Sequence, residues 1–319
     1  MLTLFSPLTL GRIRLSNRIV LAAVPSGYAA PGGFADSALA AYYCARAQGG
    51  VGMLVFEHTY VLPPPDSTIP HLGLYGDAQI ADFHHCIAAT HQQGAATLVM
   101  LDQPLSLEGW RPAEIIDLGE SFIAAAWRAH AAGANGVMLS AADGGPFEQL
   151  ISPLQNQRAD YYGGAGAGRL RLLLEVVEGI QKWLGDHFIV GVRLNVEEFA
   201  PGGLTLQDAR VIAKRLIGAG VKLLEVTARN SADIPIAHFP GWQVPLAAGM
   251  KAVVEVPVLV GRLSDDPALA DGVIRDGSAD LVALNEALRA NPLWTQDARA
   301  ALLKVSNGSA PTRTRSRQN

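Results

Sequence analysis

Eight short apolar runs alternate with longer stretches of helical periodicity along this chain. The runs are residues 19–24, 53–56, 97–101, 136–139, 189–194, 223–226, 258–260 and 281–284. They are rich in leucine and β-branched residues and do not alternate with polar ones. Such runs are typical of parallel strands whose two faces are both buried. The pattern therefore predicts a parallel sheet with helices packed against it.

The helical stretches between these runs end at recognisable stops. Residues 37–48, 77–93 and 120–132 are each followed by glycine, the residue favoured just beyond a helix end. The stretch 205–218 opens with Thr205 and Asp208 at the spacing of a capping box. A strand followed by a helix repeats along the chain, and the composition does not change in a way that would mark a second domain. This pattern predicts an α/β fold, a single (β/α)8 TIM barrel over residues 1–300. The alternative is a doubly wound open sheet, for which Pro25-Ser26-Gly27-Tyr28 is a poor phosphate-binding turn.

Composition narrows the classes of function. The chain has 319 residues, is 49% hydrophobic and carries 25 basic against 29 acidic residues, for a net charge of −4. No nucleic-acid or membrane-surface role is expected from this balance. The sequence has no leader pattern and no apolar run of about 20 residues, so a cytoplasmic protein is expected. Residues 301–319, rich in Ser, Thr, Arg and Asn, are predicted to be disordered.

Polar residues follow each of the eight runs. In a barrel these positions share the rim at the carboxyl ends of the strands, which carries the active site in barrel enzymes. The long connections 59–76, 102–113 and 230–248 are expected to wall this site. The rim residues are Pro25, Ser26, Glu57, His58, Asp102, Gln103, Ser140, Asp143, Arg193, Asn195, Thr227, Arg229, Asn230, Gly261, Arg262, Asn285 and Glu286.

A specific motif follows the fourth run. Its residues resemble, in order and spacing, the L-S-P-x-x-N-x-R-x-D-x-Y-G-G signature of the Old Yellow Enzyme family, which consists of FMN-dependent ene reductases. The similarity extends from Leu4-Phe5 to Asn291-Pro292. The matching positions are Leu150-Ile151-Ser152-Pro153, Asn156, Arg158, Asp160 and Tyr162-Gly163-Gly164.

The resemblance implies a flavin site with both matches and mismatches. Arg193 matches the arginine that reaches the pyrimidine edge of FMN, and Gly261-Arg262 match a segment that helps to hold the phosphate. The ring-binding glutamine of the family is replaced by Met100, and its phosphate-binding Gly-Arg pair by Asn285-Glu286. A further mismatch is His58, which stands where a small residue lies beneath the ring. FMN is therefore expected to be absent or weakly held.

The catalytic positions of the family differ more completely. Its two donors to the substrate carbonyl fall on Ser140 and Asp143, and its proton-donating tyrosine falls on Gly145. An ionised aspartate only accepts hydrogen bonds and cannot polarise a carbonyl. His58, Asp102 and Asp143 remain as candidate proton carriers.

The first hypothesis is a redox-neutral acid–base enzyme acting on a small enone-like or unsaturated carbonyl substrate, by isomerisation, elimination, cyclisation or retro-aldol cleavage. The alternatives are a divergent FMN-dependent NAD(P)H oxidoreductase and a non-catalytic ligand-binding protein. No metal site is expected. Cys44 and Cys86 lack the spacing of zinc or iron–sulfur ligands, and oxygen-rich sets such as His58, Asp102, Asp143 and Glu286, although conceivable ligands, are common on surfaces without a metal. A small molecule is the expected partner, and a homo-oligomer is left open.

Overall fold

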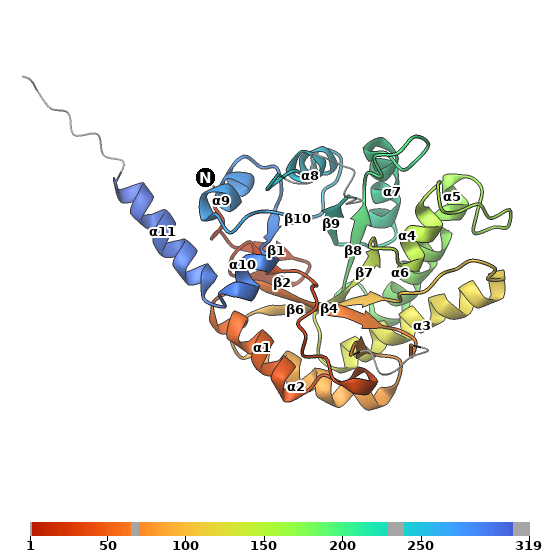
Figure 1. Cartoon of the computed structure of the whole chain (residues 1–319), viewed down its shortest axis with the longest axis horizontal. Helices are drawn as coiled ribbons and strands as arrows, with labels where there is room; N and C mark the ends of the chain where they lie inside the picture. Colours follow the sequence, from red (N-terminus) through yellow and green to blue (C-terminus); the bar gives the residue numbers. More distant parts are fainter. Residues whose placement is uncertain (1, 65–69, 229–238, 309–319) are drawn as a thin grey trace, which may run out of the picture.

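The computed structural model describes residues 2–64, 70–228 and 239–308, and its centre is a closed parallel barrel (Figure 1). Each strand pairs with the next, and β3 pairs with both β11 and β4, which closes the ring. This confirms the predicted (β/α)8 barrel and excludes the open-sheet alternative. The barrel strands are β3 (Ile19–Leu21), β4 (Met53–Tyr60), β6 (Ala96–Asp102), β7 (Gly136–Ala141), β8 (Ile189–Asn195), β9 (Leu223–Thr227), β10 (Val258–Val260) and β11 (Leu281–Ala283).

Helices surround the barrel (Figure 1). The long ones are α1 (Ser37–Gln48), α2 (Ile80–His91), α3 (Pro112–Ala131), α6 (Arg171–Leu184), α7 (Leu206–Gly218), α8 (Val244–Lys251), α9 (Pro267–Arg275) and α11 (Trp294–Gly308). Shorter elements are β5 (Leu72–Gly73), η1 (Pro31–Gly33), η2 (Asp77–Gln79), α4 (Pro146–Ile151), α5 (Gly166–Arg169) and α10 (Asn285–Ala290).

Several helix boundaries differ from the sequence predictions. Helix α3 begins well before residue 120, because Pro112 opens it and the Glu114 carboxylate accepts a hydrogen bond from the Arg111 backbone N–H at 2.6 Å. Helix α8 begins inside the segment 230–248 that was predicted to be a loop. Helix α11 continues to Gly308, so residues 301–308 are helical and their predicted disorder is wrong. The rest of that tail, like Arg229 and Asn230, lies outside the described residues.

One end of the barrel is closed by a hairpin. Strands β1 (Leu8–Leu10) and β2 (Ile13–Leu15) pair antiparallel, and Leu10 and Leu15 pack into the apolar cluster that fills the barrel. That cluster contains Met53, Ile189 and Leu281, which lie at the amino ends of their strands. Ligands therefore have access to the barrel from the carboxyl ends.

The signature motif builds the loop between α4 and α6. The Asn156 Nδ2 donates to the carbonyls of Leu150 at 2.7 Å and Tyr162 at 2.8 Å. The Arg158 Nη2 pairs with Asp160 Oδ2 at 2.6 Å. The buried Tyr162 hydroxyl donates to Glu175 at 2.9 Å. The most specific motif of the sequence thus shapes the backbone beside the site.

Candidate functional site

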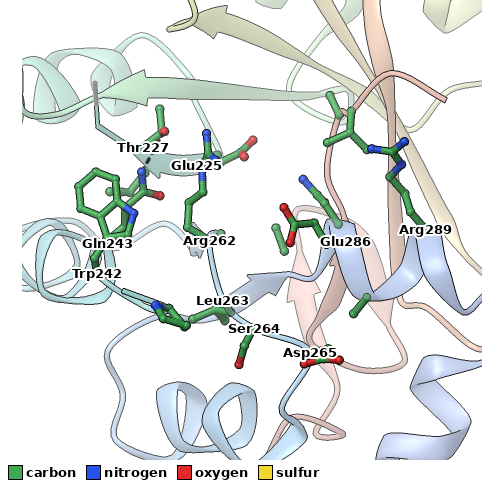
Figure 2. A pocket seen from close by; sticks show the side chains of 18 of the residues that line it. Glu225, Thr227, Trp242, Gln243, Arg262, Leu263, Ser264, Asp265, Glu286 and Arg289 are labelled. Carbon is green, nitrogen blue, oxygen red and sulfur yellow. Dashed lines mark hydrogen bonds between the residues drawn. The ribbon is translucent and has the colours of Figure 1, made fainter. Parts of the chain in front are cut away.

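A cavity of about 730 Å³ lies at the carboxyl ends of the strands. Figure 2 shows side chains from β9, α10 and the segment after β10 around it. Three arginines and three carboxylates line it, together with polar and aromatic side chains. These residues include Arg193, Arg262, Arg289, Glu225, Asp265, Glu286, Thr227, Trp242 and Gln243.

Arg193 is a largely enclosed cation of this cavity, with its side chain 12% exposed. Its Nη2 lies 3.1 Å from Asp143 Oδ2, and its Nε lies 3.9 Å from Glu225 Oε1, which is too long for a hydrogen bond. The Nε has no hydrogen-bond partner among the described residues. Burial lowers the pKa of Arg193, but the neighbouring carboxylates, first Glu225 and then Asp143, outweigh burial and raise that pKa. The guanidinium is therefore charged and only partly paired.

Glu225 is a site residue that the sequence analysis missed. Its side chain is 6% exposed, its Oε2 has no partner among the described residues, and it lines the cavity beside Arg193. Burial raises the pKa of Glu225, and the Arg193 charge opposes this rise. The available signal was a lone carboxylate inside the apolar run 223–226, where an unpaired charge is costly.

His58 and Asp102 form a hydrogen-bonded pair. The His58 Nδ1 lies 2.8 Å from Asp102 Oδ2, and the Asp102 Oδ1 accepts from the Gln103 backbone N–H at 2.8 Å. The pairing register of β4 and β6 shifts between Phe56 and Thr59. A shift of this kind re-aims the side chains within it. His58 lies in it and contacts Asp102 on the neighbouring strand.

Asp143 lies beside both the Arg193–Glu225 pair and the His58–Asp102 pair, because it contacts Arg193 and lines a cavity together with Asp102. It sits in the loop after β7 with a φ of 57°, in the left-handed region, and contacts Arg193. Asp102 and Asp143 line one open cavity of about 510 Å³, and Asp143 and Arg262 line another of about 320 Å³. The structure therefore brings the predicted residues His58, Asp102, Asp143, Arg193 and Arg262 around one end of the barrel.

A second carboxylate holds the loop that carries Asp143. The buried Glu148 accepts hydrogen bonds from the Gly144 backbone N–H at 2.5 Å and from Asn195 Nδ2 at 2.8 Å. Glu148 was not predicted as a site residue. It comes from the short helix α4, which the apolar pattern of the chain does not reveal.

Met100, Ser140 and Gly145 stand at positions where this sequence differs from the Old Yellow Enzyme pattern, and the structure shows what surrounds each of them. Met100 is fully buried in the barrel interior and does not line the 730 Å³ cavity. Ser140 is also fully buried, and its hydroxyl donates to the Ala142 carbonyl at 3.3 Å. A Cβ on Gly145 would lie 2.5 Å from Asp102 Oδ1, so any side chain at this position requires the Asp102 carboxylate to move. The carboxylate of Asp102 occupies that space.

Two further positions in the site, Gly261 and Glu286, affect ligand binding. A Cβ on Gly261 would make only an ordinary contact, 3.6 Å from the Ala283 Cβ, so the backbone there is open to a ligand. Glu286 is exposed and lines the cavity from α10, as Arg262 and Arg289 also do (Figure 2). Within the described ranges no group of three potential ligands could hold a metal ion, and no helix is long and apolar enough to cross a membrane.

Known proteins similar to this chain give a consistent picture. A profile of the NADH:flavin oxidoreductase / NADH oxidase family matches residues 3–105 and 110–304. An NADH oxidase from Thermoanaerobacter brockii is 32% identical over 93% of this chain, which covers 50% of that protein. A metal reductase from Desulforamulus reducens is 31% identical over 91% of this chain and 47% of its own length. The chain thus spans about half the length of these two relatives.

Relatives of similar length and solved structures resemble the chain over nearly its whole length. An NADPH dehydrogenase from Geobacillus thermodenitrificans is 30% identical over 91% of this chain and 92% of its own length. Morphinone reductase superposes with a TM-score of 0.80 at 23% identity, over 94% of this chain and 90% of its own. An Old Yellow Enzyme homologue from Zymomonas mobilis gives 0.78 at 23% identity, over 95% and 93% of the two chains. The chain belongs to the NADH:flavin oxidoreductase / NADH oxidase family, in which the Old Yellow Enzymes are found.

Proposed function

We propose that this chain binds FMN in the 730 Å³ cavity and acts as an NAD(P)H-dependent oxidoreductase. The observation that carries the proposal is Arg193, a cation only 12% exposed whose Nε has no hydrogen-bond partner among the described residues, in a cavity of the size that holds cofactors. A buried unpaired donor is costly unless a ligand accepts its hydrogen bond. The relatives are oxidoreductases by name, which favours this alternative over the redox-neutral hypothesis.

The residues present fit FMN at both ends of the cavity. Arg193 would bind an electron-rich edge of the ring, and the open backbone at Gly261 with Arg262 would hold the phosphate. Glu286 opposes the phosphate by charge repulsion. Weak FMN binding therefore stays a prediction. When bound, FMN supplies hydride transfer.

The chain's own residues then bind the substrate and carry protons. Because the His58 Nδ1 is bonded to the Asp102 carboxylate, its Nε2 is available to accept or release a proton. Ser140 is turned to the Ala142 carbonyl and Asp143 pairs with Arg193. Within the described residues, these two positions therefore offer no pair of hydrogen-bond donors to an enone carbonyl, and we expect another electron acceptor.

The proposal is tested by titrating FMN into the purified protein while following flavin fluorescence and NAD(P)H oxidation. Replacement of Arg193 by Met should weaken FMN binding by about tenfold or more, since it removes a charge-assisted hydrogen bond of about 1.5–3 kcal/mol. Replacement of the more exposed Arg171 by Met is the matched control and should leave binding unchanged. FMN binding that is absent from the wild type, or equal in the Arg193→Met variant, would contradict the proposal.

A further inference from the structure

Glu225 has a buried carboxylate that makes no hydrogen bond to any residue that the structure describes. It lies on β9 at the cavity, as Figure 2 shows, with its side chain 6% exposed. Its nearest ionic neighbour is Arg193, at 3.9 Å. Its Oε2 has no hydrogen-bond partner among the residues that the structure describes. Burial raises the pKa of Glu225, whereas the Arg193 charge opposes this rise and favours the ionised form, which contributes charge to the cavity and little to the hydrogen bonding of the described residues.

The charge of Glu225 changes what Arg193 offers to a ligand. Arg193 also contacts Asp143 at 3.1 Å, so two carboxylates face one guanidinium. Asp143 is 44% exposed and its charge is screened by solvent, whereas Glu225 is enclosed and acts at low dielectric. Together they cancel the positive potential that an isolated buried arginine would give.

This cancellation matters for a flavin because its two redox states differ in charge. Hydride transfer from NAD(P)H adds two electrons and one proton to the ring, so the ring gains one negative charge when no second proton follows. A fixed carboxylate in the same cavity disfavours that added charge. The effect depends on the presence of Glu225 in the cavity and not on any particular orientation of the ring.

We propose that Glu225 is a specificity-determining residue of the cavity, a buried counter-charge to Arg193 that makes the site prefer oxidised to reduced FMN and keeps the reduction potential of bound FMN low. The inference rests on the proposed function, because it requires FMN in this cavity. It concerns relative affinity for two redox states and is measured without turnover.

The test is the replacement of Glu225 by Gln, which keeps the size of the side chain and removes its charge. Dissociation constants for oxidised FMN and for anaerobically reduced FMN are measured by fluorescence and equilibrium dialysis, and the midpoint potential by dye equilibration. The variant should bind reduced FMN, relative to oxidised FMN, at least tenfold better than the wild type. For a two-electron couple this equals a rise of about 30 mV in midpoint potential.

The matched control is Glu286→Gln, which removes an exposed carboxylate from the same cavity. Repulsion between Glu286 and the phosphate acts equally on oxidised and reduced FMN, and water screens the effect of this exposed charge on the ring, so the control should leave the ratio of the two affinities unchanged. If Glu225→Gln does not fold, Asp143→Asn removes the other carboxylate beside Arg193 and should shift the potential in the same direction by a smaller amount.

The outcomes separate the two proposals. FMN that binds to Glu225→Gln with an unshifted potential would overturn the role of Glu225 and leave the proposed function intact. An equal shift in Glu286→Gln would also overturn it, because the effect would then be one of net charge alone. A wild-type protein that binds neither state of FMN would overturn the proposed function and this inference with it.

Discussion

At the scale of single residues, the site is defined by which ionisable side chains lie in contact with one another. His58 contacts Asp102 because the register of β4 against β6 shifts at His58. A Cβ on Gly145 would lie 2.5 Å from the Asp102 Oδ1, so the His58–Asp102 pair and a side chain at position 145 compete for the same space.

We expect Asp102→Asn to lower turnover by roughly a hundredfold, in the range typical of lost acid–base groups. The amide can still contact the His58 ring but no longer offers it a carboxylate. The measurement is the rate of NAD(P)H-driven turnover of the FMN-loaded protein across a range of pH. Asp117→Asn, an exposed change on α3, is the control. Wild-type rates at every pH in Asp102→Asn would assign this pair to packing alone.

At the scale of elements, caps and close approaches fix the helices. Thr205 and Asp208 form the predicted capping box, with the Thr205 Oγ1 accepting from the Asp208 N–H at 3.3 Å and Asp208 Oδ2 accepting from the Thr205 N–H at 3.1 Å. The predicted stop of α1 is also confirmed at Gly49. There the chain passes close to Pro292, in the turn after α10.

Gly49→Ala should destabilise the protein, because its Cβ would lie 1.9 Å from the Pro292 carbonyl oxygen. Overpacking of this kind costs about 1–3 kcal/mol. The control is Gly272→Ala within α9, where no atom lies within 4 Å of the added Cβ. That change should stabilise by about 0.5–1 kcal/mol through helix propensity. The stability of each variant is measured by its urea unfolding midpoint. A Gly49→Ala variant as stable as the wild type would mean that the backbone at Pro292 moves away from the added Cβ at no cost.

The signature loop should give a pH-dependent stability. Hydrogen bonds from the Arg158 guanidinium, and then from the Tyr162 backbone N–H, hold the pKa of Asp160 below its ordinary value of 3.8. A carboxyl with a lowered pKa in the fold stabilises above its unfolded pKa and loses this contribution as the pH falls through its folded pKa. Asp160→Asn should therefore be less stable than the wild type at neutral pH, with the difference narrowing below about pH 4. A difference that is constant with pH would contradict this reasoning.

At the scale of the whole molecule, the barrel is closed at one end and open at the other. The β1–β2 hairpin packs against the interior cluster, and the cavities gather at the carboxyl ends of the strands. A ligand there contacts residues from several strands at once, including Arg193 on β8 and Glu225 on β9. Binding should therefore stabilise the barrel as a unit.

FMN should accordingly raise the thermal unfolding temperature. At a free concentration 100 times its dissociation constant, a ligand that binds only the folded state adds about 2.7 kcal/mol. Differential scanning fluorimetry with a non-flavin dye measures the shift, with Arg193→Met as the comparison. An identical shift in that variant would mean that FMN binds outside the 730 Å³ cavity.

The sequence by itself determined the barrel, because strand and helix periodicities are local and the hydrophobic effect leaves few ways to bury eight apolar runs. It also placed His58, Asp102, Asp143 and Arg193 at one rim, since parallel strands carry their following residues to the same end. Tertiary structure alone decided which charges meet. Glu225 became a site residue through its contact with Arg193, a residue of the neighbouring strand. Such partners are far apart along the chain, and only strand register and loop geometry bring them into contact.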